Sequence, residues 1–255
     1  MKLLAKNLGF GYEKGKKIFD GVTIEAHSGR CLFLLGRNGV GKTTLLNCLG
    51  GIVEGEGSLS VVKDDKSEID LLKLKPKERA KIVGYVPQTV VFPPMSVFDA
   101  VLTGRLPYIK WGISKEDIRI SEDIIERLSL TDIAMRNVLT LSGGEKQKTA
   151  IARALAQKAG ILLLDEPTSN LDIKNQINVL EFLRQTTREN ELITVAVVHD
   201  LQLAVRFADD IVLLKQGKVH AACEASRLSD DDIKQVFDID AEIIKDNGKY
   251  SVLYK

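Results

Sequence analysis

Gly36-Arg37-Asn38-Gly39-Val40-Gly41-Lys42-Thr43-Thr44 is the stretch of this 255-residue chain that decides the fold. It fits the pattern G-x-x-x-x-G-K-[ST], the loop that wraps the phosphates of a nucleotide. Its glycines let the backbone come close to the phosphates and point successive N–H groups at them. Lys42 is expected to reach the β- and γ-phosphates, and the hydroxyl of Thr43 to ligate Mg²⁺. The motif therefore predicts a bound nucleoside triphosphate, which many unrelated enzymes share.

The segments on both sides of the loop support this interpretation. Cys31–Leu35, before the loop, is a short apolar run typical of a buried strand, and Thr44–Leu49, after it, has the pattern of a helix. The positive N-terminal end of that helix would face the phosphates. A glycine-rich turn that matches the pattern by chance is the alternative, but it does not explain why a strand and a helix flank it.

Composition and charge are those of an ordinary soluble globular protein. Apolar residues make up 44% of the chain, charged residues 28%, and the net charge is +1. This balance gives no bulk argument for nucleic acid or an anionic membrane as the main partner. The longest apolar runs, such as Ile193–Val198, fall far short of the roughly 20 residues that span a bilayer. With no signal-peptide pattern and three scattered cysteines, we expect a reduced, cytosolic protein.

A second motif lies at the end of another apolar run. Ile161–Leu164 is typical of a buried strand and leads into Asp165 and Glu166. Because ligands collect at the carboxyl ends of strands in α/β sheets, we expect these carboxylates beside the phosphate loop. Asp165 suits Mg²⁺, and Glu166 suits a general base that polarises an attacking water. A strand that happens to meet an acidic helix start is the alternative, and this motif alone does not exclude it.

A third motif places Ser142, Gly143 and Gly144 ahead of the helical pattern Thr149–Leu155. A hydroxyl and bare amides at a helix N-terminus form a second phosphate-binding end in the same chain. A single nucleotide needs only one such end. The simplest explanation is a head-to-tail pair of subunits, each offering its second helix end to the γ-phosphate bound by the other.

Together these motifs resemble the nucleotide-binding subunits of ABC transporters, and the resemblance covers essentially the whole chain. It implies ATP and Mg²⁺ as cofactors and adds further site residues. Tyr12 would stack on adenine, although a tyrosine packed in the core explains that position equally well. Gln88 would contact Mg²⁺ and the attacking water, and His199 would contact the γ-phosphate. Asp172, in Ser169-Asn170-Leu171-Asp172, would belong to the loop that crosses the dimer interface.

Two positions depart from the family pattern. Arg37 stands where the family commonly has proline, and we expect it to affect only loop rigidity because its backbone N–H remains. Glu145 replaces the more usual glutamine. Its carboxylate would approach a triphosphate, which is unfavourable unless Lys146 or Lys148 compensates.

The expected architecture is an α/β fold in one domain over residues 1–255: a phosphate-loop NTPase core with a parallel sheet, an N-terminal antiparallel β subdomain and a helical insertion. We expect antiparallel strands near residues 3–8, 17–26 and 57–62, and parallel strands near 31–35, 82–86, 161–165 and 193–198. The helical subdomain is predicted at about 89–158, with helices that begin after Ser96 and Ser114. The second of these helices would bury a stripe of Ile118, Ile124, Ile125 and Leu128.

The C-terminal tail, about 217–255, is expected to be an accessory without chemistry of its own. Ile211–Leu214 is assigned to the start of this tail as a strand. Ser229 is predicted to cap a short helix, and Asp246-Asn247-Gly248-Lys249 to turn a hairpin.

The segment Thr103-Gly104-Arg105-Leu106-Pro107-Tyr108 resembles one in importers for iron–siderophore, haem and cobalamin. The alternative is a helix C-cap at Gly104 followed by a proline turn. The resemblance implies a homodimeric ATPase on the cytoplasmic face of the membrane that powers uptake through a separate permease, and indirectly serves an extracytoplasmic binding protein. Another importer, an exporter, or a soluble ABC ATPase acting on ribosomes or DNA stays open, although we expect no nucleic-acid partner.

Permease docking is expected within Gln88–Tyr108, which includes the apolar and proline-stiffened run Val90–Met95, with Phe92 and Met95 as its central contacts. Such a run would be unusual on an isolated surface, and a short helix of the permease lying in a groove there would explain it. The alternative is that these residues pack the helical insertion onto the core.

Overall fold

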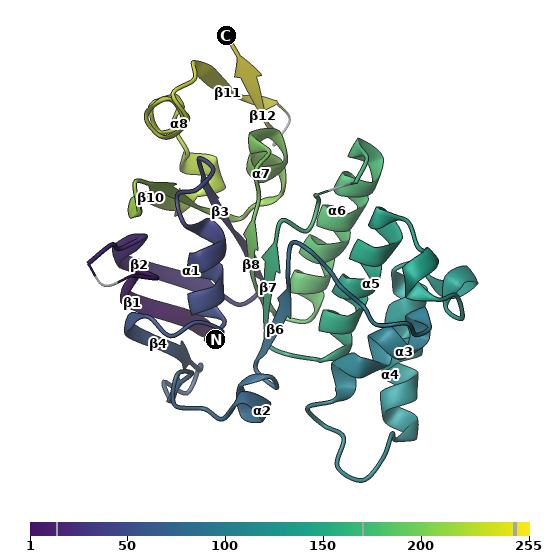
Figure 1. The fold of residues 1–255 in the computed structure, drawn as a ribbon. Coiled ribbons are helices and arrows are strands. Elements are labelled where there is room, and N and C mark those ends of the chain that lie inside the picture. The colour runs from purple at the N-terminus through teal and green to yellow at the C-terminus, as the bar shows by residue number, and fades with distance from the viewer. Residues whose placement is uncertain (14, 170, 247–248) are drawn as a thin grey trace. The chain divides into compact units, whose positions relative to one another are not determined.

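The computed structural model describes residues 1–13, 15–169, 171–246 and 249–255 and contains two units (Figure 1). The first unit combines Met1–Leu74 with Glu181–Lys255, and the second is Lys75–Leu180. Helix α6 (Ile173–Glu189) runs from the second unit into the first. The expectation of one domain over residues 1–255 stays a prediction.

The N-terminal segment forms the predicted antiparallel sheet in the first unit. Its strands β1 (Lys2–Phe10), β2 (Phe19–His27), β4 (Glu56–Val62) and β5 (Glu68–Asp70) lie in the order β2-β1-β4-β5. Figure 1 shows β2, β1 and β4 side by side. Along β2, Val22, Ile24 and Ala26 are buried while the residues between them are exposed. This period of two is what a sheet with one covered face requires. Strand β5 was not predicted because three residues are too few to show it.

The phosphate-loop strand belongs to a second sheet of the same unit. Strand β3 (Arg30–Gly36) pairs in parallel with β8 (Ile193–Val197) and with β9 (Asp210–Lys215), and β10 (Lys218–Glu224) pairs antiparallel with β9. The assignment of Ile211–Leu214 to the accessory tail is therefore wrong. These residues are buried in β9, next to β3, and their continuous apolar run is the pattern of a parallel strand covered on both faces.

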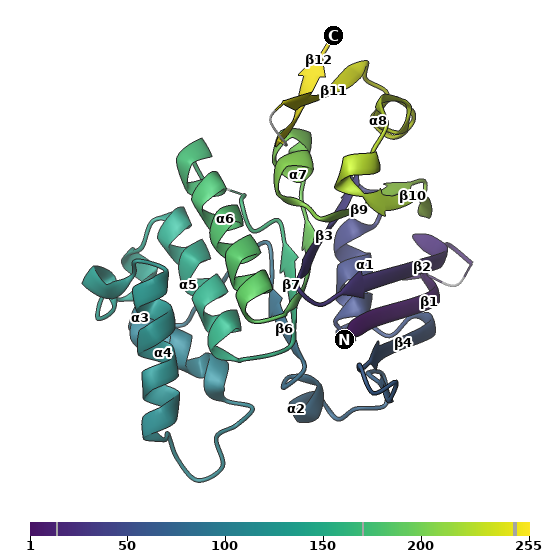
Figure 2. The ribbon, with the colours of Figure 1, turned by 180° about the vertical axis from the view of Figure 1, so that it is seen from behind.

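The remaining elements of the first unit are α1 (Lys42–Leu49), α7 (Leu201–Phe207), the 3-10 turn η4 (Ala225–Arg227), α8 (Asp230–Phe237), and strands β11 (Ala241–Asp246) and β12 (Lys249–Tyr254). Ser229 caps α8, and β11 and β12 form the predicted hairpin, whose turn residues Asn247 and Gly248 lie outside the described residues. Helix α7 packs beside β12 (Figures 1 and 2), where the Gln202 side chain accepts a hydrogen bond of 2.9 Å from Val252 N.

The second unit pairs two parallel strands, β6 (Val83–Val86) and β7 (Ile161–Asp165), and carries helices α2 (Pro76–Arg79), α3 (Val97–Leu102), α4 (Lys115–Arg127) and α5 (Gly143–Ala156). Three 3-10 turns connect them: η1 (Thr103–Arg105), η2 (Thr131–Ile133) and η3 (Val138–Thr140). Helices α3, α4 and α5 pack against one another (Figure 2) and fall inside the range expected for the helical subdomain. Ser96 and Ser114 cap α3 and α4 as predicted.

The buried face of α4 differs from the predicted one at its first turn. Ile124, Ile125 and Leu128 are buried, but Ile118 is 38% exposed. Asp117 and Ser121 take the buried positions there instead. The prediction was wrong for Ile118 because it assumed that only apolar side chains lie on the buried face of the helix. At this turn Asp117 and Ser121 occupy the buried positions that the helical spacing requires.

Gly104 and Arg105 fix the packing of the three helices. A Cβ atom at Gly104 would lie 2.1 Å from the carbonyl oxygen of Arg153, so only glycine lets η1 approach α5 this closely. The buried Arg105 donates from Nε to Asp117 Oδ1 at 2.9 Å and from Nη1 to the Ala156 carbonyl at 2.9 Å. The hydroxyl of Ser114 and then Arg105 lower the pKa of Asp117 to about 2. These contacts give Gly104 and Arg105 a structural role that a simple helix C-cap does not describe.

The loop between η1 and α4 exposes several large apolar side chains. Leu106 and Ile113 are more than half exposed and Trp111 is fully exposed. Within the described residues, no helix combines the length and apolarity needed to cross a bilayer.

Candidate active site

The phosphate loop joins the end of β3 to the start of α1, as predicted. Gly36 and Gly41 have φ values of 148° and 101°, a backbone region that favours glycine. At Gly36 a Cβ atom would lie 2.5 Å from the Leu214 carbonyl oxygen, and at Gly41 it would lie 2.6 Å from Cγ2 of Ile18. Both the conformation and the close approach of neighbouring chain therefore require glycine at these positions.

The side chain of Lys42 turns back into the phosphate loop, which precedes it in the sequence. Its side chain is buried, and Nζ donates to the carbonyl oxygens of Gly36 at 2.8 Å and Arg37 at 3.0 Å. Gly41 is the N-cap of α1 and has no side chain to bond the first N–H groups of the helix. An ammonium group and a helix N-terminus at one loop form a site suited to a phosphate. Thr43 is exposed at the same helix start.

Tyr12 lies beside the phosphate loop on a pocket of about 510 Å³, whose lining includes Lys16, Ile18, Val40 and Gln216. The ring of Tyr12 is 71% exposed and packs edge-on against Phe10, with ring centroids 4.9 Å apart. This exposure is not that of a tyrosine packed in the core. The pocket volume falls within the roughly 300–1,000 Å³ of small-molecule sites.

His199 lies two residues after the last residue of β8 and is exposed. The backbone on both sides of it is held in place. Val198 N donates to the Leu34 carbonyl of β3 at 3.3 Å, and the Asp200 carboxylate caps α7 by accepting from Gln202 N at 2.8 Å. The residue is therefore positioned at the same end of the β3–β8 pair as the phosphate loop.

In the second unit, Asp165 is buried at the end of β7 and Glu166 follows it with a φ of 49°. A positive φ is uncommon for a residue other than glycine. Ser169 holds this turn, because its N and Oγ atoms donate to the Glu166 carbonyl at 3.0 and 2.9 Å. Burial and then the charge of Asp165 raise the pKa of the neighbouring Tyr85. Backbone strain of this kind gathers at functional sites.

Gln88 and Glu166 are brought together, a contact that the sequence did not predict. Gln88 Nε2 donates to Glu166 Oε2 at 2.7 Å. The bond joins the loop after β6 to the turn after β7, two neighbouring parallel strands. It holds the carboxylate of Glu166 at one position and leaves Oε1 of Gln88 as the amide's acceptor atom.

Ser142 is the N-cap of α5, and Glu145 completes a capping box with it. Glu145 Oε2 accepts from Ser142 Oγ at 2.7 Å and from Ser142 N at 2.8 Å, while Glu145 N donates back to Ser142 Oγ at 3.3 Å. The Ser142 hydroxyl is the main cause that lowers the pKa of Glu145, and Arg136 and Lys148 add to it. The spacing S-x-x-E was the sequence signal that could have revealed this role of Glu145.

Asp172 caps the start of α6 in the structure. Its carboxylate accepts from Asn175 N at 2.8 Å and Asn175 Nδ2 at 2.9 Å, and these bonds lower its pKa. The preceding Asn170 lies outside the described residues. The predicted residues therefore form two groups: the phosphate loop, Tyr12 and His199 in the first unit, and Gln88, Asp165, Glu166, Ser142-Gly143-Gly144 and Asp172 in the second.

Comparison with known proteins identifies the family. The family described as ABC transporter matches residues 19–169. The chain belongs to the ABC transporter family. An ABC transporter ATP-binding protein of Methanocaldococcus jannaschii, itself uncharacterised, is 41% identical over 95% of this chain and 94% of that protein. The iron(3+)-hydroxamate import ATP-binding protein of Bacillus subtilis is 36% identical over 96% of this chain and 90% of that protein.

Solved structures show the same fold. One, described as an inward-facing conformation of a metal-chelate type ABC transporter, has a TM-score of 0.82 and 29% identity, and covers 99% of this chain and 98% of that one. A dimeric ATP-binding cassette bound to ADP and Pi has a TM-score of 0.77 and 27% identity, and covers 88% of this chain and 98% of that one. The chain is thus an ABC ATPase, and its homologues include ATP-binding subunits of metal-chelate importers.

Proposed function

We propose that this chain is the ATP-hydrolysing subunit of an importer for a metal chelate, such as iron–siderophore, haem or cobalamin. The catalytic part of this proposal rests on Glu166, whose backbone is strained and whose carboxylate accepts a hydrogen bond from Gln88. The similarity to the iron(3+)-hydroxamate import protein over nearly the full length of both chains supports the cargo class. The ATPase would act from the cytoplasmic face of the membrane through a separate permease, which an extracytoplasmic binding protein supplies.

In this proposal ATP binds across two copies of the chain. The residues that would contact it are Tyr12, Gly36, Arg37, Asn38, Gly39, Val40, Gly41, Lys42, Thr43 and Thr44 of one copy, and Ser142, Gly143, Gly144 and Asp172 of the other. The solved dimer with ADP and Pi supports a paired arrangement. Tyr12 would stack on the base, Lys42 would bind the β- and γ-phosphates, and His199 would bind the γ-phosphate.

The residues proposed for Mg²⁺ fit that ion. Thr43, Gln88 and Asp165 offer a hydroxyl, an amide and a carboxylate oxygen, and Mg²⁺ prefers such hard oxygen ligands. When bound, the ion would neutralise charge that develops on the phosphate oxygens. Glu166 would accept a proton from the attacking water, and the hydrogen bond from Gln88 would orient its carboxylate toward that water.

Permease docking is proposed near Val91 and not at Phe92. Phe92 is 7% exposed and lies under the guanidinium of Arg153, 5.1 Å from the ring centroid, whereas Val91 is 81% exposed. Phe92 thus packs inside the second unit, against Arg153 of α5. A charge at Phe92 would therefore unfold the unit before it tested docking.

The test is transport by a reconstituted complex. The permease that co-purifies with the tagged chain from detergent extracts is placed in proteoliposomes with the chain and the matching binding protein. Ferric hydroxamate, haem and cobalamin are then offered in parallel. We expect ATP-dependent uptake of one class, lost with Lys42→Ala and reduced with Val91→Asp. Uptake of none of the three, or co-sedimentation with ribosomes in place of a permease, would refute the importer assignment.

A further inference from the structure

We propose that the second unit binds the surface of an anionic phospholipid membrane through α2 and the loop between η1 and α4. Figures 1 and 2 show these two segments at the same end of that unit. Lys77 of α2 donates from Nζ to the Ile109 carbonyl of the loop at 3.4 Å. Nζ of Lys81, just after α2, lies 5.9 Å from the ring centroid of Tyr108. Helix and loop therefore form one continuous surface.

Lysines without ion pairs gather on this surface. Among the described residues, none of them pairs with a carboxylate, and all are exposed. They define what we term the basic end of the second unit: Lys75, Lys77, Lys81, Lys110 and Lys115. An exposed ammonium group that has no partner within its own chain can bind an anion from outside at little cost.

Few carboxylates oppose these lysines. Glu78 and Glu116 are the exposed ones on the same segments, while Asp117 is buried and already bonded to Arg105. The remaining carboxylates of α4 lie in its later turns, roughly 10 Å or more beyond its first residue, at Glu122, Asp123 and Glu126. Positive charge is therefore in excess at the basic end.

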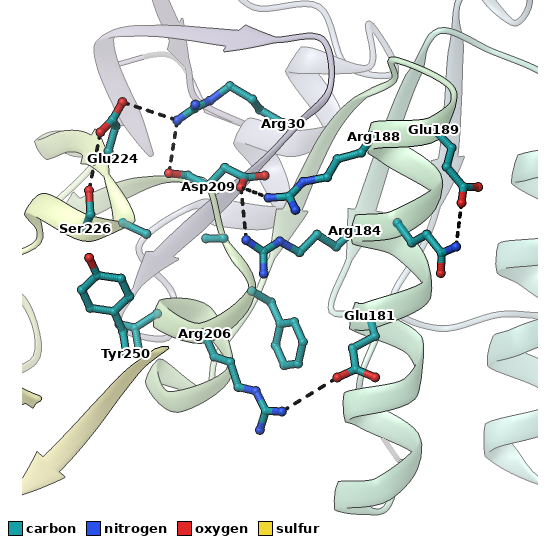
Figure 3. Close-up of a pocket in the computed structure, with 15 residues that line it drawn as sticks. Arg30, Glu181, Arg184, Arg188, Glu189, Arg206, Asp209, Glu224, Ser226 and Tyr250 are labelled. Carbon is teal, nitrogen blue, oxygen red and sulfur yellow. Dashed lines mark hydrogen bonds and ion pairs between the residues drawn. The ribbon is translucent and has the colours of Figure 1, made fainter. Parts of the chain in front are cut away.

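A pocket in the first unit shows the opposite arrangement. Figure 3 shows this pocket of about 640 Å³, in which Arg188 lies 2.9 Å from Asp209 and Arg206 lies 3.8 Å from Glu181. Its lining carries as many carboxylates as arginines, so these charges satisfy one another. The lysines of the basic end have no such balance, and their charge is available to a partner.

Large apolar side chains project beside the lysines. Trp111 is fully exposed, and Leu106 and Ile113 are more than half exposed. A Cβ atom at Gly112 would meet no atom within 4 Å apart from the two neighbouring residues, so the tip of the loop stands in open space. Exposed apolar groups that gather in one place mark an interaction surface.

Both ends of this loop are fixed to the unit. Tyr108 N donates to the Arg105 carbonyl at 2.9 Å, and the Arg105 guanidinium lies 4.2 Å from the centroid of the Tyr108 ring. Ser114 N donates to Asp117 Oδ2 at 3.0 Å where α4 begins. The loop therefore presents Trp111 on a preformed support, which lowers the entropy cost of binding.

The combination of lysine, tryptophan and aliphatic side chains favours a lipid surface. Lysine is depleted at protein–protein interfaces, whereas an anionic membrane attracts it. Tryptophan is enriched where headgroups meet acyl chains, because its ring is apolar and its N–H is polar. Leu106 and Ile113 offer no ring on which a nucleic-acid base could stack, but both can enter the acyl boundary. Anionic phospholipid therefore fits this surface better than protein or RNA.

The experiment is co-sedimentation of the full chain with phospholipid vesicles that contain no permease. The chain is saturated with ADP, so that lipid phosphates do not enter the phosphate loop. Vesicles of phosphatidylcholine are compared with vesicles rich in phosphatidylglycerol. We expect binding to the anionic vesicles that weakens as the salt concentration rises, and little binding to phosphatidylcholine alone.

Two variants separate the contributions of charge and of the indole ring. Lys110→Glu should lower the affinity for anionic vesicles about tenfold, because attraction at that position becomes repulsion. Trp111→Ser should lower it by about tenfold or more, because the apolar ring no longer enters the lipid boundary. Lys174→Glu makes the same charge change at an exposed position of α6, outside the basic end, and should bind as the original chain does. Both replaced side chains of the basic end are exposed, so thermal unfolding should stay unchanged.

The proposal is overturned if the chain does not bind anionic vesicles, or if Lys110→Glu and Trp111→Ser bind them as tightly as the original chain. Loss of permease co-purification in these variants, with no vesicle binding by the original chain, would assign the surface to a protein partner. Retention of single-stranded RNA in place of vesicles would assign it to nucleic acid. Because the vesicles hold neither permease nor cargo, a negative result here leaves the importer assignment standing, and failure of uptake leaves lipid binding standing.

Discussion

At the scale of single residues, Glu166 gives the most specific evidence about the candidate active site. Its left-handed backbone costs on the order of 1–3 kcal/mol for a residue with a side chain. Two hydrogen bonds from Ser169 hold the turn, and Gln88 holds the carboxylate. A residue held at both backbone and side chain has the preorganisation that the proposed general base requires.

We expect Glu166→Gln to keep ATP affinity within a few-fold and to lower turnover by about 10²–10⁴-fold, because the amide keeps the shape but cannot accept a proton. Steady-state phosphate release and calorimetry measure the two quantities. Glu145→Gln removes the same charge elsewhere in the second unit, and glutamine still completes a capping box, so that control should stay active. Near-normal hydrolysis by Glu166→Gln would disprove its role as the base.

Tyr12→Ala should weaken ATP binding by an amount corresponding to the loss of one base-stacking contact, about 1–3 kcal/mol. Tyr12→Phe keeps the ring on the same pocket and should bind normally. Binding of inorganic triphosphate, which has no base, should be equal in all three proteins. If Tyr12→Ala binds ATP as tightly as the original chain, adenine lies elsewhere.

At the scale of elements, a buried ion pair organises the helical part of the second unit. Arg105 on η1 joins Asp117 at the start of α4 and the last turn of α5 through the Ala156 carbonyl. Breaking a buried pair by removing one partner is more damaging than losing a surface pair, because the other charge stays buried without compensation. The segment that resembles metal-chelate importers thus contributes to folding whatever the cargo.

This ion pair predicts a specific pH dependence. The pKa of Asp117 falls from 3.8 to about 2 on folding, which corresponds to about 2 kcal/mol of stability. Since the folded-state pKa is the lower one, this stability is complete above about pH 4 and is lost as the pH falls toward 2. We therefore expect Asp117→Asn to unfold at a lower temperature at pH 6, with a gap to the original chain that narrows between pH 4 and pH 2.5.

Circular dichroism during heating measures the gap at each pH. Asp123→Asn is the matched control, because Asp123 is exposed on the same helix and should show little difference at any pH. A gap for Asp117→Asn that stays constant down to pH 2.5 would show that the charge of Asp117 does not stabilise the fold.

Elements with strong local signals could be predicted from the sequence, and those that depend on distant packing could not. Ser96, Ser114 and Ser229 begin helices where predicted, because an N-cap is decided by neighbouring residues. Strand β9 was misplaced because its apolar run lies close to the tail in sequence, while its partner β3 is about 180 residues away. Ile118 is exposed while its neighbour Asp117 is buried and bonded to Arg105, a contact that no local pattern shows.

The same distinction applies to the candidate site. The phosphate loop, Asp165 and Glu166 stand in motifs whose order predicts their places at strand ends. The bond between Gln88 and Glu166 joins residues 78 positions apart and was not predicted. The pocket lined by Arg184, Arg206, Ser226 and Tyr250 collects residues from α6, α7, η4 and β12, none of which forms a motif on its own.

At the scale of the whole molecule, the proposed ATP contacts are distributed over both units. The first unit provides the phosphate loop, Tyr12 and His199, and the second provides Gln88, Glu166 and the Ser142 helix end. A chain organised in this way can bind ATP with one unit and still depend on a second copy for turnover. The capping box at Ser142 adds a condition, because its hydroxyl already bonds Glu145 and must turn away to contact a phosphate.

Ser142→Arg should therefore prevent ATP-dependent dimerisation while leaving ATP binding by the monomer intact. The bulky side chain would lie against the γ-phosphate held by the other copy and block closure, while the phosphate loop of each monomer still binds ATP. Light scattering in the Glu166→Gln background follows ATP-dependent dimerisation, and calorimetry follows binding. Glu122→Arg, on the exposed face of α4, is the control for added charge. Dimerisation that persists in Ser142→Arg would rule out the head-to-tail arrangement.

The exposed loop between η1 and α4 has a spectroscopic consequence. The chain has a single tryptophan, and it is the fully exposed Trp111 of that loop. All indole fluorescence of the protein therefore comes from one surface position, already in contact with water in the folded state. Unfolding should change the emission maximum little, whereas a permease that covers the loop should shift it to the blue and protect it from acrylamide quenching. Without any attached dye, the light emitted by this subunit should report whether another protein lies on that loop.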